Sequence, residues 1–247
     1  MQAFTIDSAI LHETRKINVY TPPGYEKGVG IFPVLYMPDG GLEEDFPHVT
    51  ETVHKLIGEG AVRHFLVVGI ENTERRRDLS GPTENEKDKT MAVRVGGSAA
   101  FRAFVKDELI PEIQKRYRTT GERAIVGESL AGLFVVETLF LDPDLFDTYI
   151  ALSPSLWWND SKMALGAKDW LKAHPGLRKS FYLTSAGDDI LEGIEMLGAA
   201  LREAAPPGLH WIYEPRPQEH HSTIFRASEA AAYRAMLGPK PEAPKGK

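Results

Sequence analysis

The sequence predicts an α/β fold with a mostly parallel sheet covered by helices on both faces. Two observations support this prediction: short, largely apolar runs recur along the chain, and helical patterns lie between them. Strands buried on both faces have this apolar composition, and parallel neighbours need crossover connections. The 247 residues, of which 42% are hydrophobic and 26% charged, fit one large domain, expected over 1–237. Residues 238–247 are rich in Pro and Lys and predict a disordered tail.

The individual elements follow from local patterns. Arg15–Tyr20 alternates polar and apolar residues before a proline and glycine turn, which is typical of a half-exposed strand near a sheet edge. The clearest helix runs from Phe101 to Tyr117, where apolar residues recur at helical spacing, and Pro111 is expected to bend or divide it. The expected buried strands are Phe32–Met37, Phe65–Ile70, Ala124–Val126, Tyr149–Leu152, Phe181–Thr184 and His210–Tyr213.

Composition excludes several classes of protein. The net charge of -6 would repel a phosphate backbone, so we expect no nucleic-acid partner. The chain contains no cysteine, which rules out disulfides, a thiol nucleophile and cysteine-bound metals. No apolar run approaches the roughly 20 residues of a membrane span. No signal peptide is visible, so we expect a cytoplasmic protein, or a periplasmic one if a leader was removed; whether copies associate stays open.

Ser129 is the candidate nucleophile. The stretch AIVGESLAGLF, residues 124–134, runs from an apolar strand through a glycine turn into an apolar helix, which is the context of a nucleophile elbow. The G-x-S-x-G pattern is not strictly matched, because Ala131 stands where the second glycine belongs. A serine in a plain glycine turn is the alternative. The strand before it and the helix after it favour the catalytic interpretation.

A serine nucleophile needs a base, and the base needs an orienting acid. His220 and His221 follow the last expected strand, where a loop would place an imidazole above the strand ends. Asp188 and Asp189 follow the strand before it. The chain order of Ser129, an aspartate and a histidine is the order of α/β-hydrolases. Within each pair, the residues alone leave both members open.

Further groups are candidates for the rest of the site. Glycines 40 and 41 follow an early strand, and their N–H groups together with that of Leu130 could bind an oxyanion, although an ordinary turn is the alternative. Trp157 and Trp158 follow another strand and would form an apolar wall or pack in the core. Arg76, in the run Arg75–Arg77, would bind an anionic substrate or belong to a solvated loop.

With these residues in hand, the chain resembles the "putative esterase" family of α/β-hydrolases. That family includes siderophore trilactone esterases, feruloyl esterases, S-formylglutathione hydrolases and mycolyltransferases. The resemblance runs from about Phe4 to Ala230, and the stretches that carry it are VLYMPDGG, FLVVGIEN with RRRDLSGP, FVKDELIPEIQKRYRT, AIVGESLAGLF, ALSPSLWWN and EHHSTIF. It implies the α/β-hydrolase fold and ester hydrolysis.

The resemblance also assigns roles. It implies that Ser129 is the nucleophile, that His221 is the base and that Gly41 supplies the first oxyanion donor. Asp189 matches the family's acid less cleanly, and some siderophore esterases of this type are thought to use a Ser–His dyad. Glu128 stands where the family often has histidine.

The sequence therefore predicts a serine esterase that hydrolyses a carboxylic ester, such as a siderophore lactone or an aryl or acyl ester, through an acyl-enzyme. Its partner would be a small-molecule ester, and neither a cofactor nor a metal is expected. One alternative is a non-catalytic binding protein on the same fold. Another is a metal site made by His220, His221, Asp188 and Asp189, which lack a recognised ligand spacing.

Overall fold

The computed structural model describes residues 1–188 and 190–239. In this part of the chain the strands form one eight-stranded sheet in the order β1-β2-β4-β3-β5-β6-β7-β8. The pairs β1/β2 and β2/β4 are antiparallel, and the pairs from β4/β3 to β7/β8 are parallel. The strands are β1 Gln2–Ser8, β2 Glu13–Tyr20, β3 Phe32–Met37, β4 Leu66–Ile70, β5 Thr119–Glu128, β6 Thr148–Leu152, β7 Ser180–Ala186 and β8 His210–Arg216.

The apolar runs of the sequence are strands of the sheet, which confirms the predicted fold class and the position of each predicted strand. The run His210–Tyr213 was expected to be buried, but β8 is the last strand in the sheet order and its side chains are partly or fully exposed. A second expectation was also wrong in detail. The strand expected over Arg15–Tyr20 is largely buried, because β1 pairs along its outer side and forms the edge. β1 itself was missed, since its side chains are mostly exposed and it carries no apolar run.

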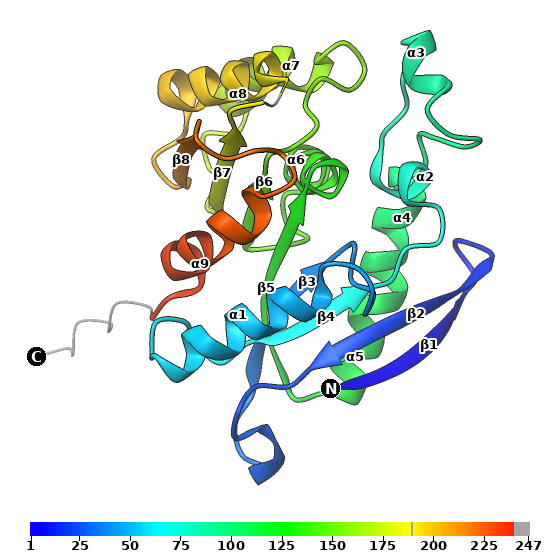
Figure 1. Cartoon of the computed structure of the whole chain (residues 1–247), viewed down its shortest axis with the longest axis vertical. Helices are drawn as coiled ribbons and strands as arrows, with labels where there is room; N and C mark the ends of the chain where they lie inside the picture. Colours follow the sequence, from blue (N-terminus) through cyan, green and yellow to red (C-terminus); the bar gives the residue numbers. More distant parts are fainter. Residues whose placement is uncertain (189, 240–247) are drawn as a thin grey trace, which may run out of the picture.

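Helices cover both faces of the sheet (Figure 1). On one face, α1 and α9 pack over side chains such as Leu35, Val126 and Ile150. On the other face, α4 to α8 pack over Tyr36, Ile125 and neighbouring strand residues. None of the described helices combines the length and apolar character needed to cross a bilayer. The helices are α1 Phe46–Gly58, α2 Arg75–Leu79, α3 Glu86–Lys89, α4 Ser98–Phe104, α5 Ile110–Arg116, α6 Leu130–Leu141, α7 Lys162–Ala173, α8 Leu191–Ala204 and α9 Ile224–Leu237, with a 3₁₀ turn at Tyr25–Lys27.

The helix expected over Phe101 to Tyr117 is divided, as Pro111 predicts. A π-helical turn over Val105–Leu109 separates α4 from α5, and Pro111 lies in the first turn of α5. Proline has no N–H for an α-helical hydrogen bond, and a wider turn before it accommodates the missing bond.

The parallel strands direct their carboxyl ends to the same edge of the sheet, where the loops of an open α/β sheet form a crevice. The segments that end β3, β5, β6, β7 and β8 meet there. Gly40, after β3, lies so close to β4 that a Cβ atom on it would come within 2.3 Å of the Gly69 backbone. This contact fixes the first of these loops against the sheet.

The predicted domain boundary at residue 237 stays a prediction. Asp189 and residues 240–247, which hold most of the expected tail, lie outside the described residues.

Candidate active site

Ser129 lies on a strained turn between β5 and α6. Its backbone has φ 59° and ψ −118°, a conformation that side-chain-bearing residues rarely adopt. The turn is tight enough that a Cβ atom on Gly127 would lie 2.5 Å from the Ala131 backbone. Glycine at 127 is therefore required, whereas the alanine at 131 that breaks the usual pattern fits and is fully buried. This geometry is that of a nucleophile elbow.

His221 comes from the loop after β8 and faces Ser129. Its Nε2 atom lies 3.0 Å from Ser129 Oγ, within hydrogen-bonding reach. The neighbouring His220 is more exposed, and its Nδ1 lies 3.2 Å from Asp188 Oδ2. Of the two adjacent histidines, the structure thus brings His221 to the serine.

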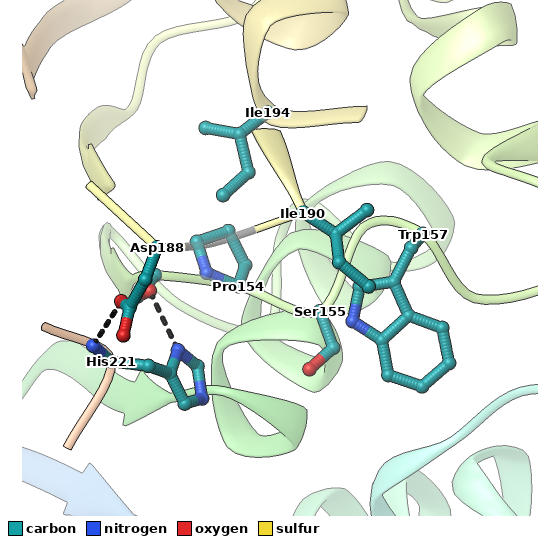
Figure 2. Close-up of a pocket in the computed structure, with 8 residues that line it drawn as sticks. Pro154, Ser155, Trp157, Asp188, Ile190, Ile194 and His221 are labelled. Atoms are coloured by element: carbon teal, nitrogen blue, oxygen red, sulfur yellow. Dashed lines mark hydrogen bonds between the residues drawn. The ribbon is translucent and has the colours of Figure 1, made fainter. Parts of the chain in front are cut away.

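Among the described residues, Ser153 and Asp188 hold His221 in this position. Ser153, at the end of β6, places its Oγ 3.0 Å from Nδ1 of the ring. Asp188, at the end of β7, accepts the backbone N–H of His221 at 2.6 Å (Figure 2). The same N–H lowers the pKa of Asp188, because it stabilises the ionised carboxylate. Asp188 thus fixes the loop, and Asp189, the expected acid, lies outside the described residues.

The two candidate oxyanion donors have different surroundings. Leu130 is the first residue of α6, so its N–H has no intrahelical acceptor and lies at the positive end of the helix dipole. The Gly41 N–H donates to Glu44 Oε2 at 2.7 Å. An oxyanion could bind Gly41 only if the Glu44 side chain moved away.

The Ser129 and His221 pair lies between two unlike cavities. One, of about 260 Å³, has a largely apolar wall and borders His221 and Asp188 (Figure 2); the wall is formed by Pro154, Trp157, Ile190 and Ile194. The other, of about 320 Å³, borders Ser129 and His221 on a charged side, formed by Asp45, His48, Arg75, Glu128 and Arg226. The two sides of the site thus present unlike surfaces, one apolar and one charged.

The remaining predicted residues divide between these cavities and other places. Trp157 lines the apolar cavity, but Trp158 is buried, donates its indole N–H to the Gly81 carbonyl and lines a separate cavity beside α6 and α7. Arg76 is exposed and borders a surface hollow with Arg77. Arg75, rather than Arg76, borders the cavity at Ser129.

Arg75 and Glu128 set the electrostatics of the charged cavity. Arg75 makes a two-fold ion pair with Asp39, with both nitrogen to oxygen distances at 2.7 Å. Burial raises the pKa of Glu128 to about 7, against the lowering effects of His221 and Arg75.

Sequence reasoning missed several residues of the site, among them Ser153, Glu128 and Glu44. Ser153 lies in the stretch ALSPSLWWN and directly follows β6, the strand beside β5, just as Ser129 directly follows β5. That parallel was the available signal. The contacts of Glu128 with His221 and of Glu44 with Gly41 depend on side-chain directions, and no spacing in the sequence shows them.

A serine on a strained strand-to-helix turn, faced by a histidine from the loop after the last strand of such a sheet, defines the α/β-hydrolase class. Comparisons with known proteins agree with this class. The family model described as "Putative esterase" matches residues 8–189. The chain belongs to this esterase family, and this confirms the resemblance seen in the sequence.

Two curated proteins that match part of the chain are named as siderophore esterases. The chain is 36% identical over 145 residues to the ferri-bacillibactin esterase BesA of Bacillus subtilis, covering 52% of this chain and 49% of the relative. It is 31% identical over 149 residues to the siderophore triacetylfusarinine C esterase of Aspergillus fumigatus, covering 54% and 48%. The matches thus span about half the length of these relatives.

A solved structure extends the likeness to nearly the whole chain. The IroE-like serine hydrolase from Shewanella oneidensis superposes with a TM-score of 0.84 at 26% identity, covering 96% of this chain and 79% of that one.

Proposed function

We propose that this chain is a serine esterase that hydrolyses a carboxylic ester through an acyl-enzyme on Ser129. The observation that carries the proposal is the 3.0 Å approach of His221 Nε2 to the Ser129 hydroxyl on its strained turn. A serine hydroxyl at its ordinary pKa is a poor nucleophile, and an imidazole in this position can remove its proton as it attacks.

The reaction follows from the positions of the groups. Ser129 Oγ attacks the ester carbonyl carbon while its proton passes to His221 Nε2, and the carbonyl oxygen becomes an oxyanion near the Leu130 N–H. The C–O bond to the alcohol then breaks, and the imidazolium gives its proton to the leaving oxygen. Water repeats the sequence on the acyl-enzyme and releases the acid.

Asp189 is the proposed acid that orients His221, with Ser153 as a second group at Nδ1. An imidazole that donates its Nδ1 proton to an oxygen presents the Nε2 lone pair to Ser129. Gly41 is the proposed second oxyanion donor, after displacement of Glu44.

For the substrate, we propose an ester of the siderophore type. The relatives named above are siderophore esterases, and the cavities beside Ser129 suit a molecule with an apolar or aromatic part and a charged part. Trp157 would contact the apolar part. Arg76, exposed in a surface hollow that Arg75 also borders, would attract an anionic one.

A fluorophosphonate probe and a substrate panel test the proposal. The probe is expected to label the native chain at Ser129, as located by mass spectrometry of the digested protein, and chelator is expected to leave hydrolysis unchanged. The panel holds p-nitrophenyl esters of increasing chain length, a feruloyl ester and a catecholate trilactone. A folded protein that binds panel members but is neither labelled nor active would be a binding protein instead.

A further inference from the structure

Glu128 is a mostly buried carboxylate beside the catalytic base. Its side chain is 15% exposed, and its Oε1 lies 3.2 Å from His221 Nε2. This Oε1 atom accepts no hydrogen bond from the residues that the structure describes. A buried carboxylate oxygen without a donor is costly, unless a positive charge appears next to it.

Other charged groups surround Glu128, and most are already neutralised. Arg75 is held by Asp39. Burial opposes a charge on His48, but hydrogen bonds to Asp45 and Glu229 outweigh it and raise the pKa of His48 to about 9. Arg226 is exposed to solvent. The groups that face Glu128 from the packed elements are Arg75 of α2, Asp39 after β3, Asp45 and His48 at the start of α1, Arg226 of α9 and His221 after β8.

Glu128 and Ser129 meet the same atom of the imidazole. The Ser129 hydroxyl approaches Nε2 in hydrogen-bonding geometry, whereas the Glu128 carboxylate lies beside it at ion-pair distance. When Ser129 transfers its proton to Nε2, the positive charge therefore forms next to Glu128. At such a distance, opposite charges stabilise each other strongly in a partly buried site.

We propose that Glu128 acts through His221, as the electrostatic partner that stabilises the imidazolium formed when Ser129 attacks. The inference rests on the proposed function, because it requires His221 to be the base. It has a second consequence with the opposite effect on rate: the same carboxylate also favours the protonated imidazole before the reaction. Glu128 therefore stabilises the transition state. It also raises the pKa of His221, so the resting enzyme becomes active only at a higher pH.

Glu128→Gln tests the inference, because it removes the charge and keeps the shape. Without the negative neighbour the imidazolium is less stable, so the pKa of His221 falls. We expect the acidic limb of the profile of kcat/KM against pH to move down by about one unit, and the alkaline plateau to fall by up to about tenfold. Glu203→Gln is the matched control, since it removes an exposed carboxylate on α8 that pairs with Lys168. Its profile is expected to match the native one.

A second measurement does not depend on turnover. The His221 imidazole is titrated by NMR in the native protein, in Glu128→Gln and in Glu128→Asp, with circular dichroism as the check on folding. The pKa of His221 is expected to fall in the Gln variant and to fall less in the Asp variant, which keeps the charge.

The outcomes separate the two proposals. An unmoved His221 pKa and acidic limb in a folded Gln variant, with labelling of Ser129 intact, would overturn the role of Glu128 alone. A rate loss equal at every pH would mean a structural role and would also overturn it. A native protein that is neither labelled nor active would overturn the proposed function, and this inference with it.

Discussion

Two serines contact the same imidazole from neighbouring strand ends. Ser129 directly follows β5 and Ser153 directly follows β6, and both have positive φ angles, 59° and 47°. The Oγ of Ser129 lies 3.0 Å from Nε2 of His221, and the Oγ of Ser153 lies 3.0 Å from Nδ1. In residue type, position after a strand and backbone strain, the two are alike.

The two serines differ in access and in the segment that each one precedes. Ser129 is partly exposed, borders the charged cavity and begins α6. Ser153 is 1% exposed and precedes an irregular segment. Ser153 also borders a cavity, the apolar one, but its side chain is buried and no helix begins after it. A substrate carbonyl beside Ser129 thus meets the positive end of a helix, and one beside Ser153 does not. Backbone strain alone therefore does not identify a nucleophile; access and the ring nitrogen it faces do.

The largest loss of activity is expected from removal of the Ser129 hydroxyl, and it distinguishes Ser129 from Ser153. Ser129→Ala removes the attacking oxygen and is expected to lower ester hydrolysis by about 10³-fold or more, with circular dichroism and thermal unfolding unchanged. Steady-state kinetics on the best ester of the panel measure it. Near-normal turnover in the folded variant would contradict the role of Ser129.

The adjacent histidines give the next test. His221→Ala removes the base and is expected to cost nearly as much as Ser129→Ala, because the two side chains act as a unit. His220→Ala, the matched control, removes an exposed imidazole that contacts Asp188, and measurable turnover is expected to survive. Reversed phenotypes would place the wrong histidine at the serine.

The adjacent aspartates are expected to have smaller effects. Asp189→Asn is expected to lower kcat by on the order of 10²-fold, less than Ser129→Ala, because an orienting acid contributes less than the nucleophile. Asp188→Asn keeps an oxygen for the His221 N–H and is expected to cost less. If neither variant lowers kcat, the enzyme works as a Ser–His dyad.

Ser153 is expected to give the smallest loss. Removing its hydroxyl takes one hydrogen bond from Nδ1 and is expected to lower kcat by about tenfold or less. Ser153→Gly and Ser153→Ala distinguish the effect of the lost hydroxyl from that of backbone strain. Both variants remove the oxygen, but only alanine is strained at φ 47°, by about 1 kcal/mol. Equal kcat with a lower melting temperature for alanine is expected. If kcat instead follows stability, the hydroxyl has no orienting role.

Much of the fold could be predicted from the sequence, because strands that are buried on both faces consist of short apolar runs. β1 escaped, since an edge strand with exposed side chains carries no such run. Within the site, Ser129 and His221 could be placed because each follows a strand, and strand order brings their loops together. Ser153, Glu128 and Glu44 could not be assigned contacts, because these depend on rotamers and on the packing of elements distant in sequence.

The contact between Glu44 and Gly41 makes oxyanion binding at Gly41 an exchange of one acceptor for another. A carboxylate three residues away is a tethered ligand, present at a high effective concentration. The neutral carbonyl oxygen of a bound ester is a weaker acceptor than this carboxylate and would leave it in place. The full charge of a tetrahedral intermediate competes on equal terms. If Gly41 binds the oxyanion, Glu44 makes the donor selective. The Gly41 N–H stays bonded to Glu44 while the ester is in its ground state, and it becomes available only to the charged tetrahedral intermediate.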